Sequence, residues 1–280
     1  MNQNRTPILL SSLQNPNVKD IIHLRERHER DRTGTFIIEG YREILRATDA
    51  NWKINAIFVC PELFLGTNEP ALIQRINARG AQQYTCTQKV FEKISYRDRP
   101  DGVIAIATQK KMGLSDLDYI FKTGKPPLLV VAEAIEKPGN LGTILRSSDA
   151  VGVDALIVCD RCTDIYNPNV VRASVGTLFT VPTVEAKGEE TLEWLKKHGV
   201  YILAATPQAD KEFTEVDVSG PVAIAVGTEQ LGLSKRWMEQ AHLQVSIPMN
   251  GVADSLNVAM ATTLLLYEAH RQRKKTNKKI

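Results

Sequence analysis

The sequence predicts an α/β protein with two domains, the second of which contains a parallel sheet. Three observations predict this class: short helical and strand-like segments alternate through the first hundred or so residues, a polar stretch follows, and five apolar runs of strand length come after it. Helical segments separate most of these runs, a pattern typical of a parallel sheet covered on both faces. A length of 280 residues also favours two domains over one.

The first predicted element is a helix. Asn15 can cap it and Pro16 suits its first position, so we expect this helix to run to about Arg30. Two further helices are expected at residues 41–47 and 71–78. The strands of this domain are expected at the apolar residues 36–38, 56–59 and 103–107, the last after a turn at residues 99–102.

A polar stretch at residues 109–127 has weak periodicity and ends in Lys125-Pro126-Pro127, which indicates a linker. The predicted domains are therefore residues 1–108 and 128–280. The five strands of the second domain are expected at residues 128–132, 155–158, 200–204, 222–226 and 243–247.

Composition is that of an ordinary globular protein, with 43% hydrophobic and 24% charged residues. No apolar stretch has the length of a membrane span, and the N-terminal residues have no signal pattern. The four cysteines are few for this length. We therefore expect a cytoplasmic protein that has no membrane partner.

Net charge is only +3, but basic residues gather at two places. One is the C-terminal end, residues 271–279. Such clusters suit contact with RNA phosphates, although a solvated helix face and a frayed tail are the alternative for each. The candidate RNA-binding residues of the other cluster, in the first helix, are Arg25, Arg27, Arg30 and Arg32.

Three polar segments follow predicted strands, where an open α/β sheet places its ligand site. In the first, a Pro-Gly turn precedes Asn140, which we expect to cap the next helix, and Arg146 lies six residues further on. A guanidinium at that place can bind a phosphate with two hydrogen bonds. A turn, a cap and a surface arginine without a ligand are the alternative.

The second segment contains two glycines and Glu229 directly after a strand. Glycine allows a ligand to approach the backbone, and the carboxylate can bind a ligand or cap a helix. An ordinary turn with Ser234 as the next N-cap is the alternative. In the third segment we expect Ser255 as N-cap and Asn257 in the first helical turn, with its amide free. The helix that follows is apolar on nearly all sides, which predicts burial within one chain or across a dimer interface.

Several common sites are not indicated. No G-x-G-x-x-G or Walker A motif follows a strand, which argues against a nicotinamide or nucleotide site. Cys159 and Cys162 form a lone pair, whereas structural zinc needs four ligands, and the five histidines make no spaced cluster. We expect no metal site, and thiols that are buried or partly buried.

Three sequence motifs that occur in this order indicate a protein family more specifically than any one of them alone. They are Asn140-Leu141-Gly142-Thr143-Ile144-Leu145-Arg146, Gly227-Thr228-Glu229 with Gly232-Leu233-Ser234, and Ile247-Pro248-Met249 with Ser255-Leu256-Asn257-Val258. Together they resemble the SpoU, or TrmH-type, family of RNA ribose 2′-O-methyltransferases. The resemblance covers residues 128–280, and the first hundred residues resemble, more loosely, the L30e-like substrate-binding domain attached to this family. Glu136-Lys137 stand where Asp or Asn is more usual.

The resemblance implies a C-terminal trefoil knot, which general topology rules would argue against. It also implies a homodimer with active sites near its interface, and S-adenosylmethionine as cofactor. The cofactor contacts that it implies are Thr206, Gly227, Ile247, Met249 and Leu256. The catalytic set that it implies is Asn140, Arg146, Glu229, Ser255 and Asn257.

In this interpretation Arg146 holds the phosphate beside the target ribose and touches the 2′-oxygen. Because arginine stays protonated in proteins, we expect it to stabilise the developing alkoxide rather than act as a base. Asn140 and Asn257 would fix this arginine, the ribose or the loops. Glu229 would orient Asn140 or the loop backbone, with a direct role as base as the less favoured alternative. The N-terminal domain would select a structured RNA, with ribosomal RNA preferred. Three alternatives stay open: a tRNA 2′-O-methyltransferase, a base methyltransferase of the same fold, and a non-catalytic RNA-binding or ribosome-assembly protein.

Overall fold

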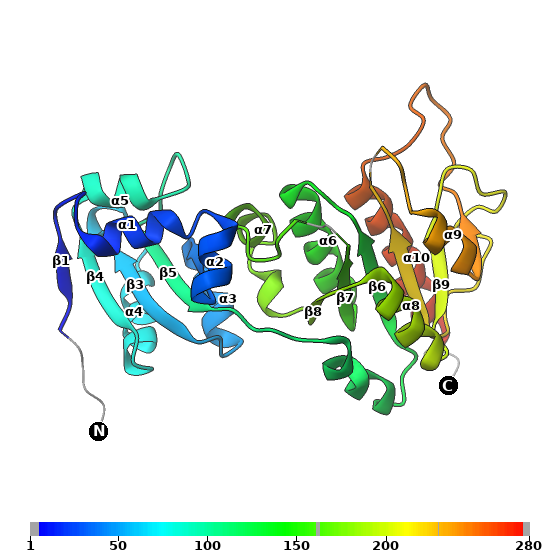
Figure 1. Cartoon of the computed structure of the whole chain (residues 1–280), viewed down its shortest axis with the longest axis horizontal. Coiled ribbons are helices and arrows are strands. Elements are labelled where there is room, and N and C mark those ends of the chain that lie inside the picture. The colour runs from blue at the N-terminus through cyan, green and yellow to red at the C-terminus, as the bar shows by residue number, and fades with distance from the viewer. Residues whose placement is uncertain (1–5, 161–162, 229, 277–280) are drawn as a thin grey trace. The chain divides into compact units, whose positions relative to one another are not determined.

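The computed structural model describes residues 6–160, 163–228 and 230–276. The chain forms two compact units, shown in Figure 1. Unit 1 is Met1–Lys110 together with Asp164–Thr180, and unit 2 is Lys111–Thr163 together with Val181–Ile280.

Unit 1 contains a five-stranded sheet in the order β1-β4-β3-β5-β2. Strands β1, β4 and β3 run parallel, and β5 is antiparallel to both of its neighbours. The strands are β1 (Ile8–Leu10), β2 (Thr35–Glu39), β3 (Ile54–Val59), β4 (Gln82–Cys86) and β5 (Val103–Thr108). The helices from the N-terminal part of the chain are α1 (Pro16–His23), α2 (Arg27–Thr33), α3 (Tyr41–Asp49), α4 (Glu69–Ala78) and α5 (Gln88–Ile94), with a short 3-10 helix η1 (Pro61–Leu63).

The first predicted helix is two helices in the structure. Its start is confirmed, since the Asn15 side chain accepts the N–H of Asn17. Its continuity to Arg30 is wrong, because the guanidinium of Arg30 binds the carbonyls of Leu24 and Arg25, at 2.9 and 2.7 Å. A continuous helix would give these carbonyls to backbone N–H groups four residues later.

Unit 1 also contains a segment from far along the chain, Asp164–Thr180, with α7 (Pro168–Ala173) and the 3-10 helix η3 (Thr177–Phe179). A buried ion pair of 2.6 Å joins Asp164 to Arg30. Near it, Tyr166 and Phe179 pack against the rings of Phe36 and Trp52. The segment therefore contributes to the core of unit 1, which the sequence analysis did not predict.

Unit 2 contains a six-stranded sheet in the order β11-β9-β10-β6-β7-β8, and all its paired strands are parallel. The five predicted strands are confirmed. The strands are β6 (Leu128–Glu133), β7 (Ala155–Cys159), β8 (Thr183–Ala186), β9 (Tyr201–Ala205), β10 (Val222–Val226) and β11 (Leu243–Val245). Three strands, β1, β4 and β8, were not predicted. The apolar run of β1 is only three residues long, and β4 and β8 have no apolar run.

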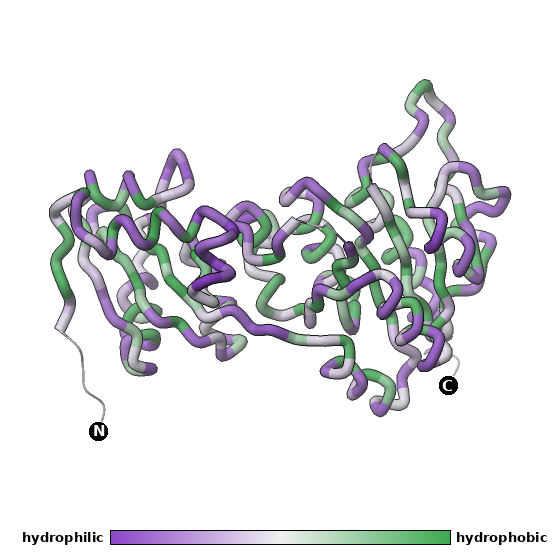
Figure 2. Tube along the Cα trace, viewed as in Figure 1, coloured by the Kyte–Doolittle hydropathy of each residue, from purple (hydrophilic) through white to green (hydrophobic). Residues whose placement is uncertain are grey.

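Every residue of β6, β7 and β10 is buried, which confirms a sheet covered on both faces. The same strands are mostly in the hydrophobic colour in Figure 2. One face packs against the two helices α8 (Gly188–Lys197) and α9 (Lys235–Gln240), and against the 3-10 helix η2 (Leu114–Lys122). Leu117 and Ile120 of η2 are buried, so this part of the predicted linker packs on unit 2.

Two further helices of unit 2, α6 (Pro138–Val151) and α10 (Val258–Thr276), pack against each other, and α10 also contacts β10. The hydroxyls of Ser147 and Thr263 join the two helices at 2.6 Å. None of the helices over the described residues combines the length and the apolar composition that crossing a membrane requires.

Candidate active site at the carboxyl edge of the parallel sheet

The three predicted motifs begin where neighbouring parallel strands end. Strands β6, β10, β9 and β11 are adjacent in the sheet, so their carboxyl ends lie at one edge. In an open α/β sheet, loops at this edge form the ligand site.

The first motif follows β6, which ends at the buried Glu133. The Glu133 carboxylate accepts the N–H of Ser234 at 2.7 Å and so holds the loop after β10 against the end of β6. Ser234 stands at the N-cap position of α9, as the alternative interpretation of the second motif predicts. After Glu133 the backbone turns sharply, with Ala134 at φ +53°.

The expectation that Asn140 caps the next helix is wrong, because α6 begins at Pro138 with Lys137 at its N-cap position. Asn140 lies in the first turn instead. The N-cap predicted in the third motif is also wrong. Helix α10 begins at Val258, and the Asn257 side chain accepts the N–H of Ala259 at 3.0 Å. Asn257 rather than Ser255 is therefore the cap.

These shifts bring two predicted residues together. The Asn257 side-chain amide donates to Asn140 Oδ1 at 3.1 Å, across 117 positions of sequence. The bond joins the first turn of α6 to the start of α10. The expectation of a free amide at residue 257 is therefore wrong, since both ends of the side chain are engaged.

The second motif depends on Gly227, which is buried at the end of β10. A Cβ there would clash with the carbonyl of Gly232 and the backbone nitrogen of Leu233, so the chain itself requires glycine at this position. Thr228 and Gly232 exchange two backbone hydrogen bonds of 3.0 Å and close the turn. Glu229 lies outside the described residues.

A cleft of about 120 Å³ opens where the three motifs meet. Its walls come from the loop after β6, the first turn of α6, the turn after β10 and the start of α10. Leu231 in its wall is 87% exposed, so part of the wall is an uncovered apolar surface. The residues that line the cleft are Ile135, Glu136, Lys137, Asn140, Thr228, Gln230, Leu231 and Val258.

The residues predicted to contact the cofactor lie in loops at this edge. The Thr206 N–H donates to Val245 O at 3.0 Å, and its hydroxyl donates to Gln208. Ile247, Met249 and Leu256 are half-buried beyond β11. Partly covered apolar side chains between backbone turns suit a ligand with an aromatic base, so these loops are compatible with the predicted cofactor.

Arg146 is exposed in the middle of α6. Among the described residues, none makes a hydrogen bond or an ion pair with its guanidinium. Ser255 is exposed in the loop before α10. The structure thus brings Asn140 and Asn257 into contact, and leaves Arg146 and Ser255 at the surface of unit 2.

The arginines predicted to bind RNA have different environments in unit 1. Arg27 and Arg32 are exposed, each paired with a carboxylate of the same helix. Arg25 is half-buried and donates to three carbonyls at the end of α5. Arg30 does not fit the prediction, because it is 1% exposed and its guanidinium is used by Asp164 and two carbonyls.

The three cysteines that the structure describes are buried, as the sequence predicts. Burial raises the pKa of the Cys60 and Cys86 thiols to about 12. Cys159 is also buried and forms no disulfide, and Cys162 lies outside the described residues. Within the described ranges, no three His, Cys, Asp or Glu side chains gather as a metal site would require.

A parallel sheet with polar loops gathered at its carboxyl edge is the arrangement in which open α/β proteins bind their ligands. Models of two families match the chain: the SpoU rRNA Methylase family over residues 127–267, and the MRM3-like substrate binding domain over residues 15–105. The chain belongs to the SpoU rRNA methylase family, which confirms the resemblance carried by the three motifs.

Relatives cover nearly the whole chain. The 23S rRNA (uridine(2479)-2′-O)-methyltransferase of Streptomyces viridochromogenes is 32% identical over 89% of this chain and 87% of the relative. The 23S rRNA (guanosine(2553)-2′-O)-methyltransferase RlmP of Bacillus subtilis is 30% identical over 92% and 97%. An AdoMet-bound rRNA methyltransferase from Sinorhizobium meliloti has a similar structure, with a TM-score of 0.85, 32% identity and coverage of 96% and 98%. This likeness confirms the predicted fold class, while the trefoil knot stays a prediction.

Proposed function

We propose that this protein transfers a methyl group from S-adenosylmethionine to a ribose 2′-hydroxyl of ribosomal RNA. The observation that carries the proposal is the cleft in which the Asn140–Asn257 hydrogen bond joins the first and third motifs beside the second. The names of the relatives support both the reaction and the ribosomal substrate.

The bound cofactor supplies a methyl group on a sulfonium centre, which leaves without acid assistance. The protein must therefore hold the hydroxyl in line and assist loss of its proton. We assign this role to Arg146, which binds the phosphate beside the target ribose and stabilises charge that develops on the 2′-oxygen.

The other site residues position this arginine and the two substrates. Asn140 and Asn257 fix the starts of α6 and α10 through their hydrogen bond. Ser255 and Glu229 are assigned to the loops that surround the ribose, where Glu229 orients the backbone. The proposed cofactor contacts, made mostly through backbone atoms, are Thr206, Gly227, Ile247, Met249 and Leu256.

We also propose that the enzyme works as a homodimer through the outer face of α10. Met260, Leu264 and Tyr267 are 62%, 41% and 52% exposed and, at i, i+4 and i+7, form one apolar stripe. The opposite face of α10 packs within unit 2. The sequence predicts that this helix is buried on nearly all sides, so a second surface would have to cover the stripe. A second copy of the chain would cover the stripe beside α6, the helix that carries Arg146.

The double substitution Leu264→Glu/Tyr267→Glu is expected to convert the dimer to a monomer, because it places charge in an apolar interface. Size-exclusion chromatography with light scattering should show half the wild-type mass. Tyr201→Glu is the matched control, since Tyr201 is 57% exposed at the start of β9. A dimer that persists in the double variant contradicts this interface.

Unit 1 is proposed to select the RNA, with Arg27 and Arg32 available for phosphate contact, and the protein is proposed to act in the cytoplasm. The test of the function is incubation of the protein with tritiated S-adenosylmethionine and size-fractionated total RNA. We expect label in ribosomal RNA. Label confined to transfer RNA would correct the substrate, and absence of both label and calorimetric cofactor binding would contradict the proposal in favour of a non-catalytic RNA-binding protein.

A further inference from the structure

Unit 1 displays one aromatic ring on a rigid turn. Tyr96 follows α5 and is 41% exposed. Its N–H donates to a carboxylate oxygen of Glu39 at 2.8 Å, and the other oxygen accepts from the Ser95 hydroxyl and the Arg97 N–H. Glu39 is itself only 7% exposed, so a buried carboxylate with three partners fixes this turn.

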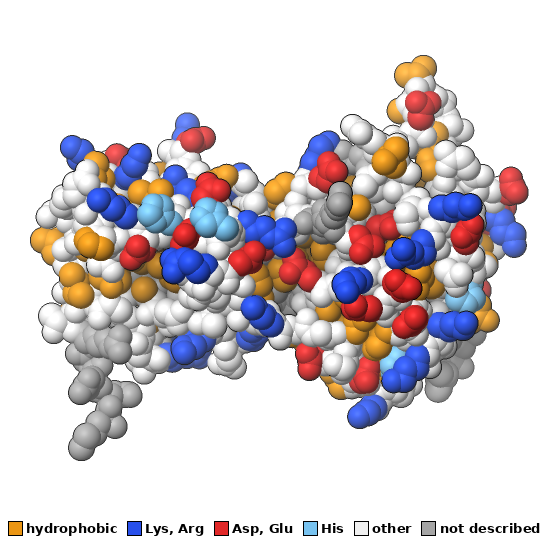
Figure 3. Space-filling model, viewed as in Figure 1, with side chains coloured by type: hydrophobic (Ala, Val, Ile, Leu, Met, Phe, Trp, Pro, Cys, Tyr) orange, Lys and Arg blue, Asp and Glu red, His pale blue; other side chains and the backbone are white. Residues whose placement is uncertain are grey.

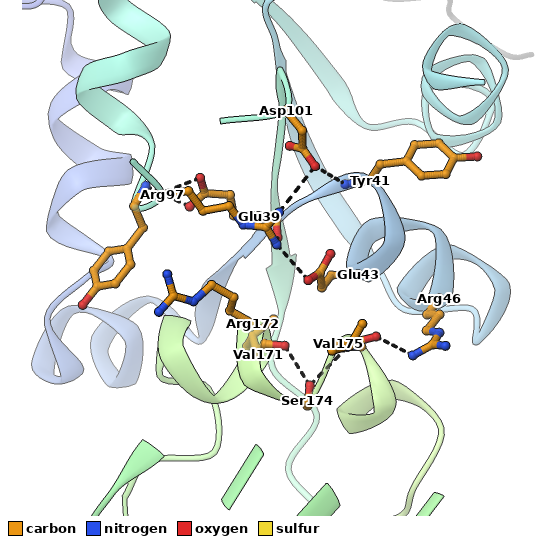
Figure 4. A network of polar contacts seen from close by, with 12 residues as sticks. Glu39, Tyr41, Glu43, Arg46, Arg97, Asp101, Val171, Arg172, Ser174 and Val175 are labelled. Carbon is orange, nitrogen blue, oxygen red and sulfur yellow. Dashed lines mark hydrogen bonds and ion pairs between the residues drawn. The ribbon is translucent and has the colours of Figure 1, made fainter. Parts of the chain in front are cut away.

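A second set of contacts holds the other side of the turn, as Figure 4 shows. The Arg97 guanidinium lies 2.8 Å from Glu43 and 3.6 Å from Asp101, and it also donates to the Glu39 carbonyl at 2.9 Å. Gly40, at φ +113°, leaves the space that this guanidinium and the Glu43 carboxylate occupy. The ring of Tyr96 is therefore presented on a turn with little freedom to move.

Two cations and an amide surround the ring. The guanidinium carbons of Arg25 and Arg172 lie 5.6 and 6.0 Å from its centroid, within the range of cation–π contact. Asn169 donates to the Tyr96 hydroxyl at 3.0 Å and accepts from Arg172 at 3.2 Å. Arg25 is anchored on the carbonyls at the end of α5, whereas Arg172 is exposed.

This cluster combines residues from two distant parts of the chain. Tyr96 and Arg25 lie in the region that matches a substrate-binding domain, and Asn169 and Arg172 lie in the region that matches the SpoU methylase model. On the face of the molecule shown in Figure 3, Lys and Arg side chains are interspersed with Asp and Glu. Charge alone therefore does not mark an RNA surface there, and a fixed aromatic ring between guanidinium groups is a more specific feature.

We infer that Tyr96 and Arg172 form a stacking site for an unpaired base of the RNA substrate, and that Arg25 and Arg172 contact its neighbouring phosphates. Unpaired bases stack on aromatic rings and on guanidinium planes, and this is the usual means of recognising single-stranded RNA. The inference rests on the proposed function, because it names the part of the RNA substrate that unit 1 binds.

The test compares Tyr96→Leu, Tyr96→Phe and the control Tyr119→Leu in the full chain; Tyr119 is 51% exposed in unit 2. Fluorescence anisotropy would measure binding to a labelled RNA hairpin with a single-stranded loop, and to the same stem closed as a duplex. Tyr96→Leu is expected to weaken hairpin binding roughly 5- to 100-fold, the usual cost of losing one stacked base. Duplex binding, cofactor binding and thermal unfolding should change little, and Tyr96→Phe should retain most of the affinity.

Three results would overturn the stacking site. The first is wild-type hairpin affinity in Tyr96→Leu, and the second is an equal loss on hairpin and duplex. The third is a combination of two observations: Tyr96→Leu unfolds at a much lower temperature, and Tyr96→Phe also loses affinity. That result would show that the role of Tyr96 is to hold α7 in place through its hydroxyl. Methylation of ribosomal RNA by the wild-type protein is measured separately, so a failure of the stacking site and a failure of the proposed function give different results.

Discussion

Arg146→Ala is expected to reduce methyl transfer to RNA by at least ~10²-fold, the usual loss when one donor to a developing oxyanion is removed. Because Arg146 is exposed on α6 and forms no hydrogen bond or ion pair with the described residues, cofactor affinity and thermal stability should stay close to wild type. Single-turnover methylation and calorimetry with S-adenosylmethionine measure the two effects separately.

Arg146→Lys should also fail, because one ammonium cannot reproduce the two parallel hydrogen bonds of a guanidinium. Arg236→Ala is a matched control, since Arg236 is an exposed arginine on α9 of the same unit. Near-normal turnover in Arg146→Ala would remove this residue from the mechanism. Full activity in Arg146→Lys would show that a positive charge at this position is sufficient for methyl transfer, without the two parallel hydrogen bonds.

Asp164→Ala is expected to destabilise unit 1 by about 3–5 kcal/mol, because it leaves the buried Arg30 guanidinium without its counter-charge. Arg30 makes two contacts with one Asp164 oxygen, at 2.8 and 2.6 Å, and the side chains are 2% and 9% exposed. The other Asp164 oxygen accepts the Tyr166 N–H at 2.8 Å, so the loss also loosens the aromatic cluster.

Urea unfolding measures this effect, and the unit 1 transition can be followed through Trp52, which packs against Tyr166 and Phe179. Asp31→Ala is the control: its partner Arg27 lies 3.6 Å away with both side chains about 60% exposed, so the expected change is under ~1 kcal/mol. A shift in Asp164→Ala no larger than in this control would contradict the structural role of the Arg30–Asp164 pair.

The sequence predicted the parts of the fold whose signals are local. The apolar runs of β6, β7 and β10 are buried on both faces, and strands of this kind are the easiest to recognise. Contacts between distant segments could not be predicted in this way. Arg30 looked like a surface cation in a basic helix, because its partner Asp164 lies 134 positions away.

For the candidate site, the sequence indicated the three segments that meet at the cleft, but not the local geometry that brings Asn140 and Asn257 into contact. Asn140 was expected as a cap, yet Pro138 occupies the first helical turn of α6, a position that proline favours and that could have corrected the assignment. The Asn140–Asn257 bond depends on where α10 begins, and a polar loop does not specify that start. The contribution of Asp164–Thr180 to unit 1 was missed because its small α7 has no strong periodicity.

Methyl transfer to a ribose hydroxyl is tested most directly by the alkali stability of the labelled RNA. Alkaline cleavage of RNA needs a free 2′-hydroxyl, so a 2′-O-methylated residue protects the phosphodiester bond on its 3′ side. After labelling by the wild-type protein and full alkaline hydrolysis, tritium is expected in a resistant dinucleotide, and no label is expected with Arg146→Ala. Tritium in mononucleotides would instead identify a methylated base and contradict the account.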